Sequence, residues 1–140
     1  MDKIAQASAL PFRIYKNKLQ FLIITSRSGK KWIIPKGIIE SGDTDRYTAL
    51  KETQEEAGVS GKVLQNSIGS YVYEKWNSIC TVTIFPLKVT KVHDQWDESG
   101  FRKRRWVSAK RAVKKVEPKE LADLIKRFVK EKEPQTLTEI

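Results

Sequence analysis

The sequence is poor in cysteine and histidine. Among its 140 residues it has one cysteine, Cys80, and one histidine, His93. A single cysteine excludes an internal disulfide and favours the reducing cytoplasm as the location of the protein. A catalytic thiol normally needs a base beside it, and His93 is the one histidine available for that role. We therefore interpret Cys80 as a small, buried apolar side chain.

The sequence also lacks a long hydrophobic run. Its longest apolar stretches, Phe21–Ile24 and Trp32–Pro35, are far shorter than the roughly 20 residues that cross a bilayer as a helix. Residues 1–12, MDKIAQASALPF, lack the charged region followed by an apolar region that defines a signal peptide. We therefore expect no membrane-spanning segment and no membrane partner.

What the sequence has in excess is positive charge. It contains 27 Lys and Arg residues against 17 Asp and Glu residues, which gives a net charge of +10 at pH 7. Hydrophobic residues make up 39% and charged residues 31%, as is typical of a globular domain with a core of its own. We predict one domain over residues 1–140, with residues 133–140 as a frayed tail. A charge of this sign can attract nucleic acid, an anionic membrane or a polyphosphate, and of these we expect a polyphosphate or nucleic acid as the partner.

Apolar periodicity predicts several strands and two helices. The expected strands lie at 8–15, 18–26, 31–35, 67–75, 79–89 and 102–107. A turn at Lys16-Asn17 joins the first two, because asparagine tolerates the left-handed backbone conformation. Strands with one helix in mid-chain and another at the end indicate a mixed α/β domain.

The helix in mid-chain has clear start and stop signals. Asp43, Thr44 and Asp45 are suited to its N-terminal end, and Gly58 is suited to end it in the left-handed conformation. A polar, glycine-containing loop, residues 37–43, precedes it. The second helix, residues 117–132, is amphipathic.

Three glutamates gather in KETQEEAG, residues 51–58, although the chain is basic. In a helix Glu52, Glu55 and Glu56 are neighbours, and like charges at this spacing repel by roughly 0.2–0.5 kcal/mol per pair. The buried stripe expected on the opposite side consists of Leu50, Thr53 and Ala57. We therefore expect all three carboxylates on the exposed face. Such a face is either simply solvated, or it binds a divalent ion such as Mg²⁺, which prefers oxygen ligands.

The flanking residues decide between these interpretations. Residues 37–59, GIIESGDTDRYTALKETQEEAGV, resemble the Nudix box, whose pattern is Gly-x₅-Glu-x₇-Arg-Glu-apolar-x-Glu-Glu-x-Gly-apolar. The positions that match in register are Gly37, Glu52, Glu55, Glu56, Gly58 and Val59. The positions that depart are Asp43 for Glu, Lys51 for Arg and Thr53 for an apolar residue. At Thr53 we expect the hydroxyl to bond to a carbonyl of the preceding turn.

The resemblance extends to both sides of the box. Residues 26–37, SRSGKKWIIPKG, and 102–113, RKRRWVSAKRAV, are similar to the MutT-like branch of diphosphoinositol polyphosphate phosphohydrolases and diadenosine polyphosphate hydrolases. The resemblance implies an α/β/α sandwich around a central mixed sheet. It implies Mg²⁺, with Mn²⁺ as the alternative, held by Glu52, Glu56 and the carbonyl of Gly37. It also implies that Glu55 is the general base in phosphoanhydride hydrolysis.

Basic side chains offer candidates for phosphate binding. Residues 102–115 contain eight of them and no acidic one. Alternation along a strand places Lys103 and Arg105 on one face and Arg102 on the other, so we expect Arg102 to lie away from the cleft. Position matching to the polyphosphate branch selects the first face. The predicted substrate-binding residues are Arg27, Lys36, Lys103 and Arg105.

Three functions remain open at this stage. The first is an enzyme that hydrolyses a small anionic molecule, either a diadenosine polyphosphate or a diphosphoinositol polyphosphate. The second removes pyrophosphate from RNA 5′ ends, in keeping with the positive charge. The third is a nucleotide-binding module without turnover, in keeping with the three departures from the box. The oligomeric state is left open.

Overall fold

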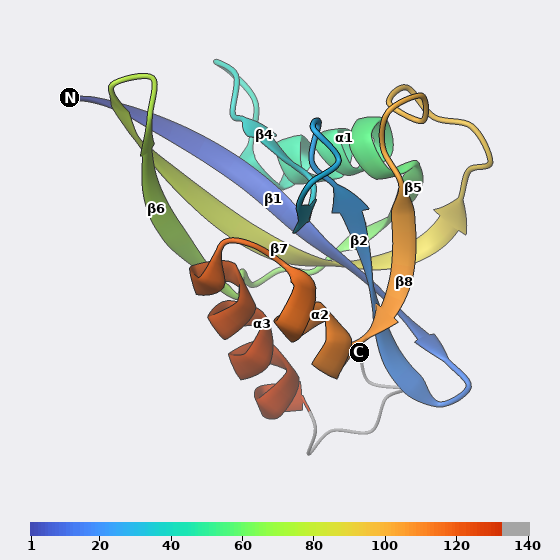
Figure 1. Ribbon diagram of the computed structural model, residues 1–140. Helices are drawn as coiled ribbons and strands as arrows, with labels where there is room; N and C mark the ends of the chain where they lie inside the picture. Colours follow the sequence, from blue (N-terminus) through green and yellow to red (C-terminus); the bar gives the residue numbers. More distant parts are fainter. Residues whose placement is uncertain (133–140) are drawn as a thin grey trace.

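The computed structural model describes residues 1–132, and the tail predicted to be frayed, residues 133–140, lies outside the described residues. Figure 1 shows a sheet with helices on both faces. In chain order the elements are β1 (Asp2–Tyr15), β2 (Lys18–Thr25), β3 (Trp32–Ile33), β4 (Lys36–Ile38), α1 (Asp45–Ala57), β5 (Val59–Val63), β6 (Gly69–Lys75), β7 (Ser78–Val92), β8 (Arg104–Ser108), α2 (Ala109–Lys115) and α3 (Lys119–Lys132).

Two long strands, β1 and β7, run through the middle of the sheet. They pair in parallel from Asp2 with Ser78 to Phe12 with Lys88, whereas every other pair among the described strands is antiparallel. The order is β3-β2-β1-β7-β5, with β4 on β1, β6 on β7 and β8 on β2. The predicted mixed sheet is therefore confirmed. The strand predicted to begin at residue 8 begins at Asp2, because pairing with β7 extends it through a polar stretch.

Two-residue turns close both hairpins of the central strands. Lys16 and Asn17 have φ angles of 52° and 63°, as the sequence predicts for a turn that matches the twist of its strands. Trp76 and Asn77, between β6 and β7, repeat this conformation with φ angles of 55° and 56°. Asparagine occupies the second position in each case, and its short polar side chain tolerates this backbone region.

The two faces of the sheet carry separate hydrophobic clusters. On one face, buried residues of the sheet, including Phe12 and Phe21, pack against Phe128 of α3 at ring distances of 6.5 and 6.3 Å. On the other face α1 buries Ala49 and Ala57 against the sheet. Figure 1 shows the same layers, with α1 behind the sheet and α2 and α3 in front. The predicted α/β/α sandwich is confirmed.

Several predicted boundaries were wrong. The expected strand 31–35 is reduced to Trp32–Ile33, and β4 overlaps the start of the expected loop 37–43. β5 and α2 were not predicted, and β8 begins at Arg104 rather than at residue 102. α2 is short and basic, and its apolar residues Ala109, Ala112 and Val113 are small, so its apolar stripe is a weak helix signal in the sequence. Within residues 1–132, no helix combines the length and the apolar character needed to cross a membrane.

Gly61 lies in β5 at an irregularity in the register with β7, between Ser60 and Gly61. A Cβ added at Gly61 would overlap the carbonyl oxygen of Lys88. We expect Gly61→Ala to destabilise the protein by about 2 kcal/mol or more, because the backbones must separate to admit it. Urea unfolding would measure this loss. The control is Gly100→Ala, whose Cβ would meet nothing within 4 Å, and an equal loss in both variants would contradict the argument.

Candidate active site

Helix α1 is fixed at both ends and packs closely on the sheet. Thr44 caps its N-terminus by accepting a hydrogen bond from Tyr47 N to Oγ1 (3.1 Å), and Gly58 ends it with a φ of 67°. Thr53 Oγ1 donates to the carbonyl of Ala49 (2.7 Å), which confirms the predicted hydroxyl bond. The buried alanine Ala49 belongs to the same hydrophobic cluster as Ala7 and Ala9 of β1, and such small side chains allow a close approach. The helix therefore holds its glutamates at a defined place over the sheet.

The structure brings together the predicted metal ligands Gly37 and Glu52. Gly37 lies in β4 and pairs with Ala7 of β1, so its backbone is held by the sheet. A Cβ added at Gly37 would overlap the Cγ, Cδ and Oε1 atoms of Glu52. The Glu52 carboxylate therefore lies directly against the main chain of Gly37. Any side chain larger than hydrogen at residue 37 would push the two groups apart.

Glu56 is buried, with 6% of its surface exposed, so its predicted place on an exposed helix face was wrong. The residues between β7 and β8, residues 93–103, cover it, and the helical pattern alone gave no sign of that cover. Burial raises the pKa of the Glu56 carboxyl to about 9, and a hydrogen bond with Glu52 acts in the same direction. Arg102 Nη2, 3.5 Å from Glu56 Oε1, acts in the opposite direction.

Glu55, the predicted general base, lies at the accessible edge of this group. It is half-exposed and lines an open pocket together with His93 and Trp96. Burial, slight as it is, raises the pKa of the Glu55 carboxyl, and the nearby Glu52 carboxylate raises it further. A carboxylate in this position can reach solvent, as a group that removes a proton from water must.

The donor atoms fit a hard divalent cation. Two carboxylates in contact, those of Glu52 and Glu56, meet the backbone of Gly37, and oxygen donors of this kind suit Mg²⁺. Across residues 1–132, no group of three or more His, Cys, Asp and Glu side chains is arranged to hold a metal ion. The Gly37 carbonyl, or substrate oxygens, could supply further oxygen donors beside the two carboxylates.

Arg102 is buried beneath the site instead of facing away from it, which corrects the prediction from strand alternation. Its exposed fraction is 7%. Its Nε donates to Glu98 Oε1 (2.9 Å) and its Nη1 donates to the carbonyl of Thr25 (2.8 Å), while Nη2 faces Glu56. Residue 102 precedes β8, so the alternation of that strand does not apply to it. Arg102 ties α1, the end of β2 and the residues before β8 together.

Arg104 and Trp96 cap the C-terminus of α1. Trp96 Nε1 donates to the carbonyl of Glu56 (3.0 Å), and Arg104 Nη1 donates to the carbonyls of Ala57 (3.0 Å) and Gly58 (3.2 Å). The guanidinium lies 4.0 Å from the centre of the Trp96 ring. These residues were not predicted. The signal for them was indirect: the last turn of α1 has no basic residue of its own to interact with its carbonyl ends.

Lys36 lies on the opposite face of the sheet from Gly37. Its Nζ donates to the hydroxyl of Tyr73 (3.1 Å), which in turn donates to Gln6 Oε1 (2.6 Å). Burial lowers the pKa of the Lys36 ammonium, and the nearby Lys75 charge lowers it further. A mostly apolar cavity of about 280 Å³ lies beside it. The cavity is lined by Lys31, Ile33, Ile34, Lys36, Tyr71, Tyr73, Glu117, Pro118 and Leu121.

The other predicted substrate-binding residues are exposed on the surface. The Arg27 guanidinium lies 5.1 Å from the ring centre of Phe101, and the Arg105 guanidinium lies 5.6 Å from that of Trp32. The backbone N–H of Lys103 donates to Thr25 Oγ1 (2.9 Å), which holds Lys103 at the end of β2. The structure therefore places these cations on several elements, and it does not gather them with Lys36 into one pocket.

A family model described as the NUDIX domain matches residues 6–129 of this chain. The chain belongs to the Nudix family. Nudix hydrolase 21 of Arabidopsis thaliana is 33% identical over 129 residues, which cover 88% of this chain and 65% of that protein. Diphosphoinositol polyphosphate phosphohydrolase 2 of Mus musculus is 32% identical over 111 residues, which cover 78% of this chain and 60% of that protein. The Nudix chain thus spans less than two thirds of the length of either relative.

The fold of this Nudix chain is shared with solved structures. A crystal structure of a C. elegans Ap4A hydrolase superimposes with a TM-score of 0.74 at 23% identity, over 91% of this chain and 96% of that one. The MutT protein of Methanosarcina mazei Go1 superimposes with a TM-score of 0.72 at 20% identity. At these identities the likeness supports the fold alone. The Nudix family, predicted from residues 37–59 and the segments beside them, is confirmed. The two relatives named above are both hydrolases.

The raised pKa of Glu56 predicts how the stability of the metal-free Nudix protein depends on pH. In the unfolded chain a glutamate has a pKa of about 4.3, so between that value and about 9 the folded state retains a proton that the unfolded state has lost. This contribution to stability is complete below the unfolded pKa and is lost as pH rises through the folded pKa. Urea unfolding in chelator should therefore give a lower free energy at about pH 8.5 than at about pH 6. Glu56→Gln should reduce this slope, and an unchanged slope would assign it to other groups.

The position of Arg102 predicts a large difference between two neighbouring basic residues. Arg102→Ala should lower the free energy of unfolding by about 3 kcal/mol, because it leaves acceptors on the buried Glu56 and Thr25 and on the half-buried Glu98 without their donor. Lys103→Ala, at an exposed side chain, should change it by about 0.5 kcal/mol or less. Thermal and urea unfolding of both variants would compare them. A loss in Arg102→Ala as small as that expected for Lys103→Ala would mean that the Arg102 contacts contribute no stability.

Proposed function

We propose that this Nudix protein hydrolyses a phosphoanhydride bond in a nucleoside diphosphate-linked small molecule, with Mg²⁺ or Mn²⁺ as cofactor. The observation that carries the proposal is the contact of the Glu52 carboxylate with the Gly37 backbone on one side and with Glu56 on the other. In this place a bound cation offsets the repulsion that three neighbouring glutamates impose on α1. A purely solvated acidic face would not bury Glu56.

Each glutamate has a proposed role in this reaction. Glu52 and Glu56, with the carbonyl of Gly37, would hold the cation. When bound, such a cation neutralises phosphate oxygens and lowers the pKa of a coordinated water. Glu55 would accept a proton from the attacking water as its oxygen bonds to phosphorus and the phosphoanhydride P–O bond breaks, with the bridging oxygen leaving on the other phosphate. The half-exposed position of Glu55 supports this role.

The cavity beside Lys36, whose ammonium is close enough to Glu56 to be affected by its charge, suits a nucleoside better than an inositol polyphosphate. Its walls include two tyrosines, Tyr71 and Tyr73, and apolar side chains such as Leu121. Aromatic and apolar walls suit the flat, weakly polar surface of a base. An inositol polyphosphate presents phosphates around its whole ring and would need cations on every side. We therefore propose a diadenosine polyphosphate as the preferred substrate class over a diphosphoinositol polyphosphate.

Phosphate contacts are proposed for four cations, Arg27, Lys36, Lys103 and Arg105. Lys36 lies at the cavity, and the other three are exposed. Among residues 1–132, none of these four cations forms an ion pair with a carboxylate. Their charges are therefore available to an anionic substrate. We also propose that residues 1–140 act as one domain in the cytoplasm, as the single, buried Cys80 favours.

Removal of pyrophosphate from RNA 5′ ends is the second candidate, and the net charge of +10 favours it. A non-catalytic binding module is the third, and its support is limited to the exchanges at Asp43, Lys51 and Thr53. Thr53 is fully buried and its hydroxyl is bonded within the helix, so this exchange leaves the helix intact. The complete glutamate set weakens the third candidate.

A substrate panel tests the proposal. A diadenosine polyphosphate, a diphosphoinositol polyphosphate and a 5′-triphosphorylated RNA oligomer would be supplied at equal concentration with Mg²⁺, and the products resolved by chromatography. We expect the highest kcat/KM for the diadenosine compound and no turnover in excess chelator. Glu55→Gln should lower kcat by about 10²–10⁴-fold while thermal stability stays near that of the unaltered protein.

Each alternative has its own outcome in this panel. Full turnover in excess chelator would refute the metal role, and a clear preference for the RNA would reverse the ranking of substrates. Binding of the diadenosine compound without any product from the three substrates would favour the binding module. The matched control is Gln54→Glu, which adds an exposed carboxylate next to Glu55 without altering the proposed base. It should retain turnover.

A further inference from the structure

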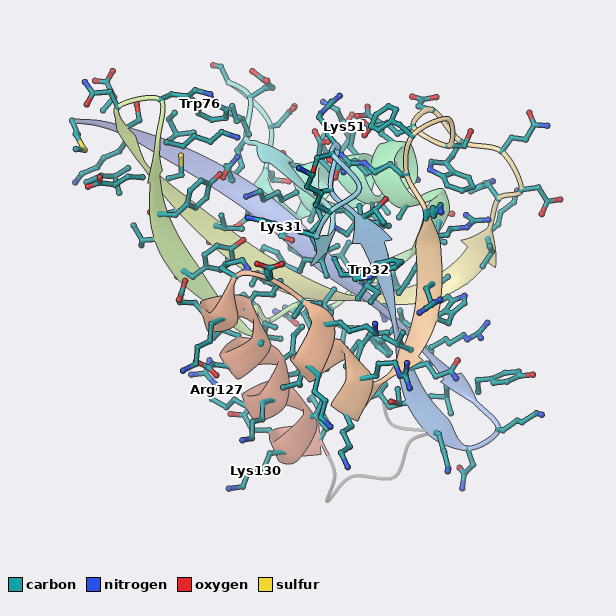
Figure 2. The ribbon with its side chains drawn as sticks, viewed as in Figure 1. Lys31, Trp32, Lys51, Trp76, Arg127 and Lys130 are labelled. Carbon is teal, nitrogen blue, oxygen red and sulfur yellow. The ribbon has the colours of Figure 1, made fainter. Side chains whose placement is uncertain are left out.

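A groove with an apolar floor and a basic rim lies between α2 and α3. Its volume is about 380 Å³, and its lining is almost entirely apolar apart from the ends of its lysines. The floor consists of the half-buried side chains Ala109, Val113 and Val129. The rim consists of Lys110, Lys114, Lys126 and Lys130, all of them exposed. Lys130, labelled in Figure 2, projects from α3 into solvent.

The positive charge of this groove is not balanced by nearby acids. Arg111 and Lys115 add a second basic hollow beside it, shared with Lys110 and Lys114. In the part of the chain that the structure describes, none of these six cations takes part in an ion pair, and no acidic residue lines either hollow. Glu131 of α3, next to Lys130 in the sequence, is paired with Arg127 (3.8 Å).

This arrangement works against the stability of the two helices. Lys110 with Lys114, Arg111 with Lys115 and Lys126 with Lys130 are like charges at the i,i+4 spacing, which destabilises a helix. Two of these cations, Lys110 and Arg111, stand in the first turn of α2, at the positive end of the helix dipole, where there is no acidic residue. An anionic partner would relieve both effects at once. Lys114, Lys115 and Lys130 lie in the last turns of their helices, where a cation is favourable, but this gain does not remove the repulsion within the three i,i+4 pairs.

We propose that the α2–α3 groove binds an acidic amphipathic segment of a partner protein. Apolar side chains on one face of such a segment would cover Ala109, Val113 and Val129, and acidic side chains at its edges would meet the lysines on both sides. A narrow apolar floor between two rows of cations has the shape and the charge of this ligand. The site lies across the sheet from Glu52, Glu55 and Glu56, so a bound partner leaves them accessible.

Other occupants fit these observations less well. A flat membrane surface would meet the lysines but could not reach an apolar floor that lies below them. A nucleic acid would also meet the lysines, but its phosphates would leave the floor uncovered, and the groove offers no aromatic side chain for bases. A second copy of this chain carries the same net charge of +10 and would be repelled.

The test measures binding of a labelled synthetic peptide of about 14 residues, roughly four helical turns, with leucine along one face and glutamate elsewhere. Fluorescence anisotropy would give its Kd for the full chain. Lys110→Glu with Lys114→Glu should weaken binding by about tenfold or more. Val113→Ala with Val129→Ala, which keeps every charge, should weaken it by about tenfold through loss of apolar contact. Circular dichroism and thermal unfolding would confirm that both variants fold.

The matched charge control is Lys62→Glu with Lys91→Glu, two exposed lysines on β5 and β7 away from the groove. It makes the same change in net charge and should alter Kd by about threefold or less. An equal loss in this control would mean a diffuse electrostatic field and would overturn the proposal. So would no measurable binding of the peptide, equal binding of a peptide with serine in place of leucine, or tighter binding of an RNA oligomer or of phosphatidylserine vesicles.

Discussion

Glu56 carries a carboxyl group into the protein interior at a place where another carboxyl group, that of Glu52, is already in contact with it. Burying one ionised carboxylate is costly, and placing two together is more so. Two features of the surrounding structure reduce this cost. Arg102 brings a guanidinium to 3.5 Å from Glu56, and the carboxyl itself holds its proton to an unusually high pH. A divalent cation is suited to replace that proton as the source of positive charge beside the two carboxyl groups.

The sheet separates two kinds of surface. On the α1 face the acidic residues meet the backbone of β4, and the residues before β8 close over them. On the α2–α3 face the exposed charges are mainly basic, and the cavity beside Lys36 adds aromatic walls. Because each strand turns alternate residues to opposite faces, Lys36 and Gly37 serve different surfaces although they are adjacent in the sequence. Adjacent residues of this chain thus contribute functional groups to both faces of the sheet.

The parts of the site that the sequence could predict are those set by local spacing. Glu52, Glu55 and Glu56 are close because a helix makes them so, and Gly58 ends that helix because it tolerates a left-handed backbone. The contact of Gly37 with Glu52 followed from the register of the Nudix box. The burial of Glu56 did not follow, because it depends on a segment about 40 residues further along the chain, whose Trp96 donates to the Glu56 carbonyl. Arg102 was misplaced for the same reason: its neighbours belong to three separate elements, and strand alternation describes only one.

Arg102 and Lys103 are consecutive in the chain, yet they contact different parts of the molecule. Arg102 faces Glu56, and the main chain of Lys103 is joined to Thr25 by bonds in both directions, from Lys103 N to Thr25 Oγ1 and from Thr25 N to the Lys103 carbonyl. A cation bound to Glu56 would weaken the attraction between Glu56 and Arg102. Lys103 is joined to Arg102 by one peptide unit, so a shift of Arg102 would also move Lys103. If the proposed cation binds at Glu56 and the proposed anionic substrate at Lys103, we expect the two binding events to be cooperative. Such cooperativity is reciprocal by thermodynamic linkage, so a ligand that approaches Lys103 alters the affinity for the cation by the same factor.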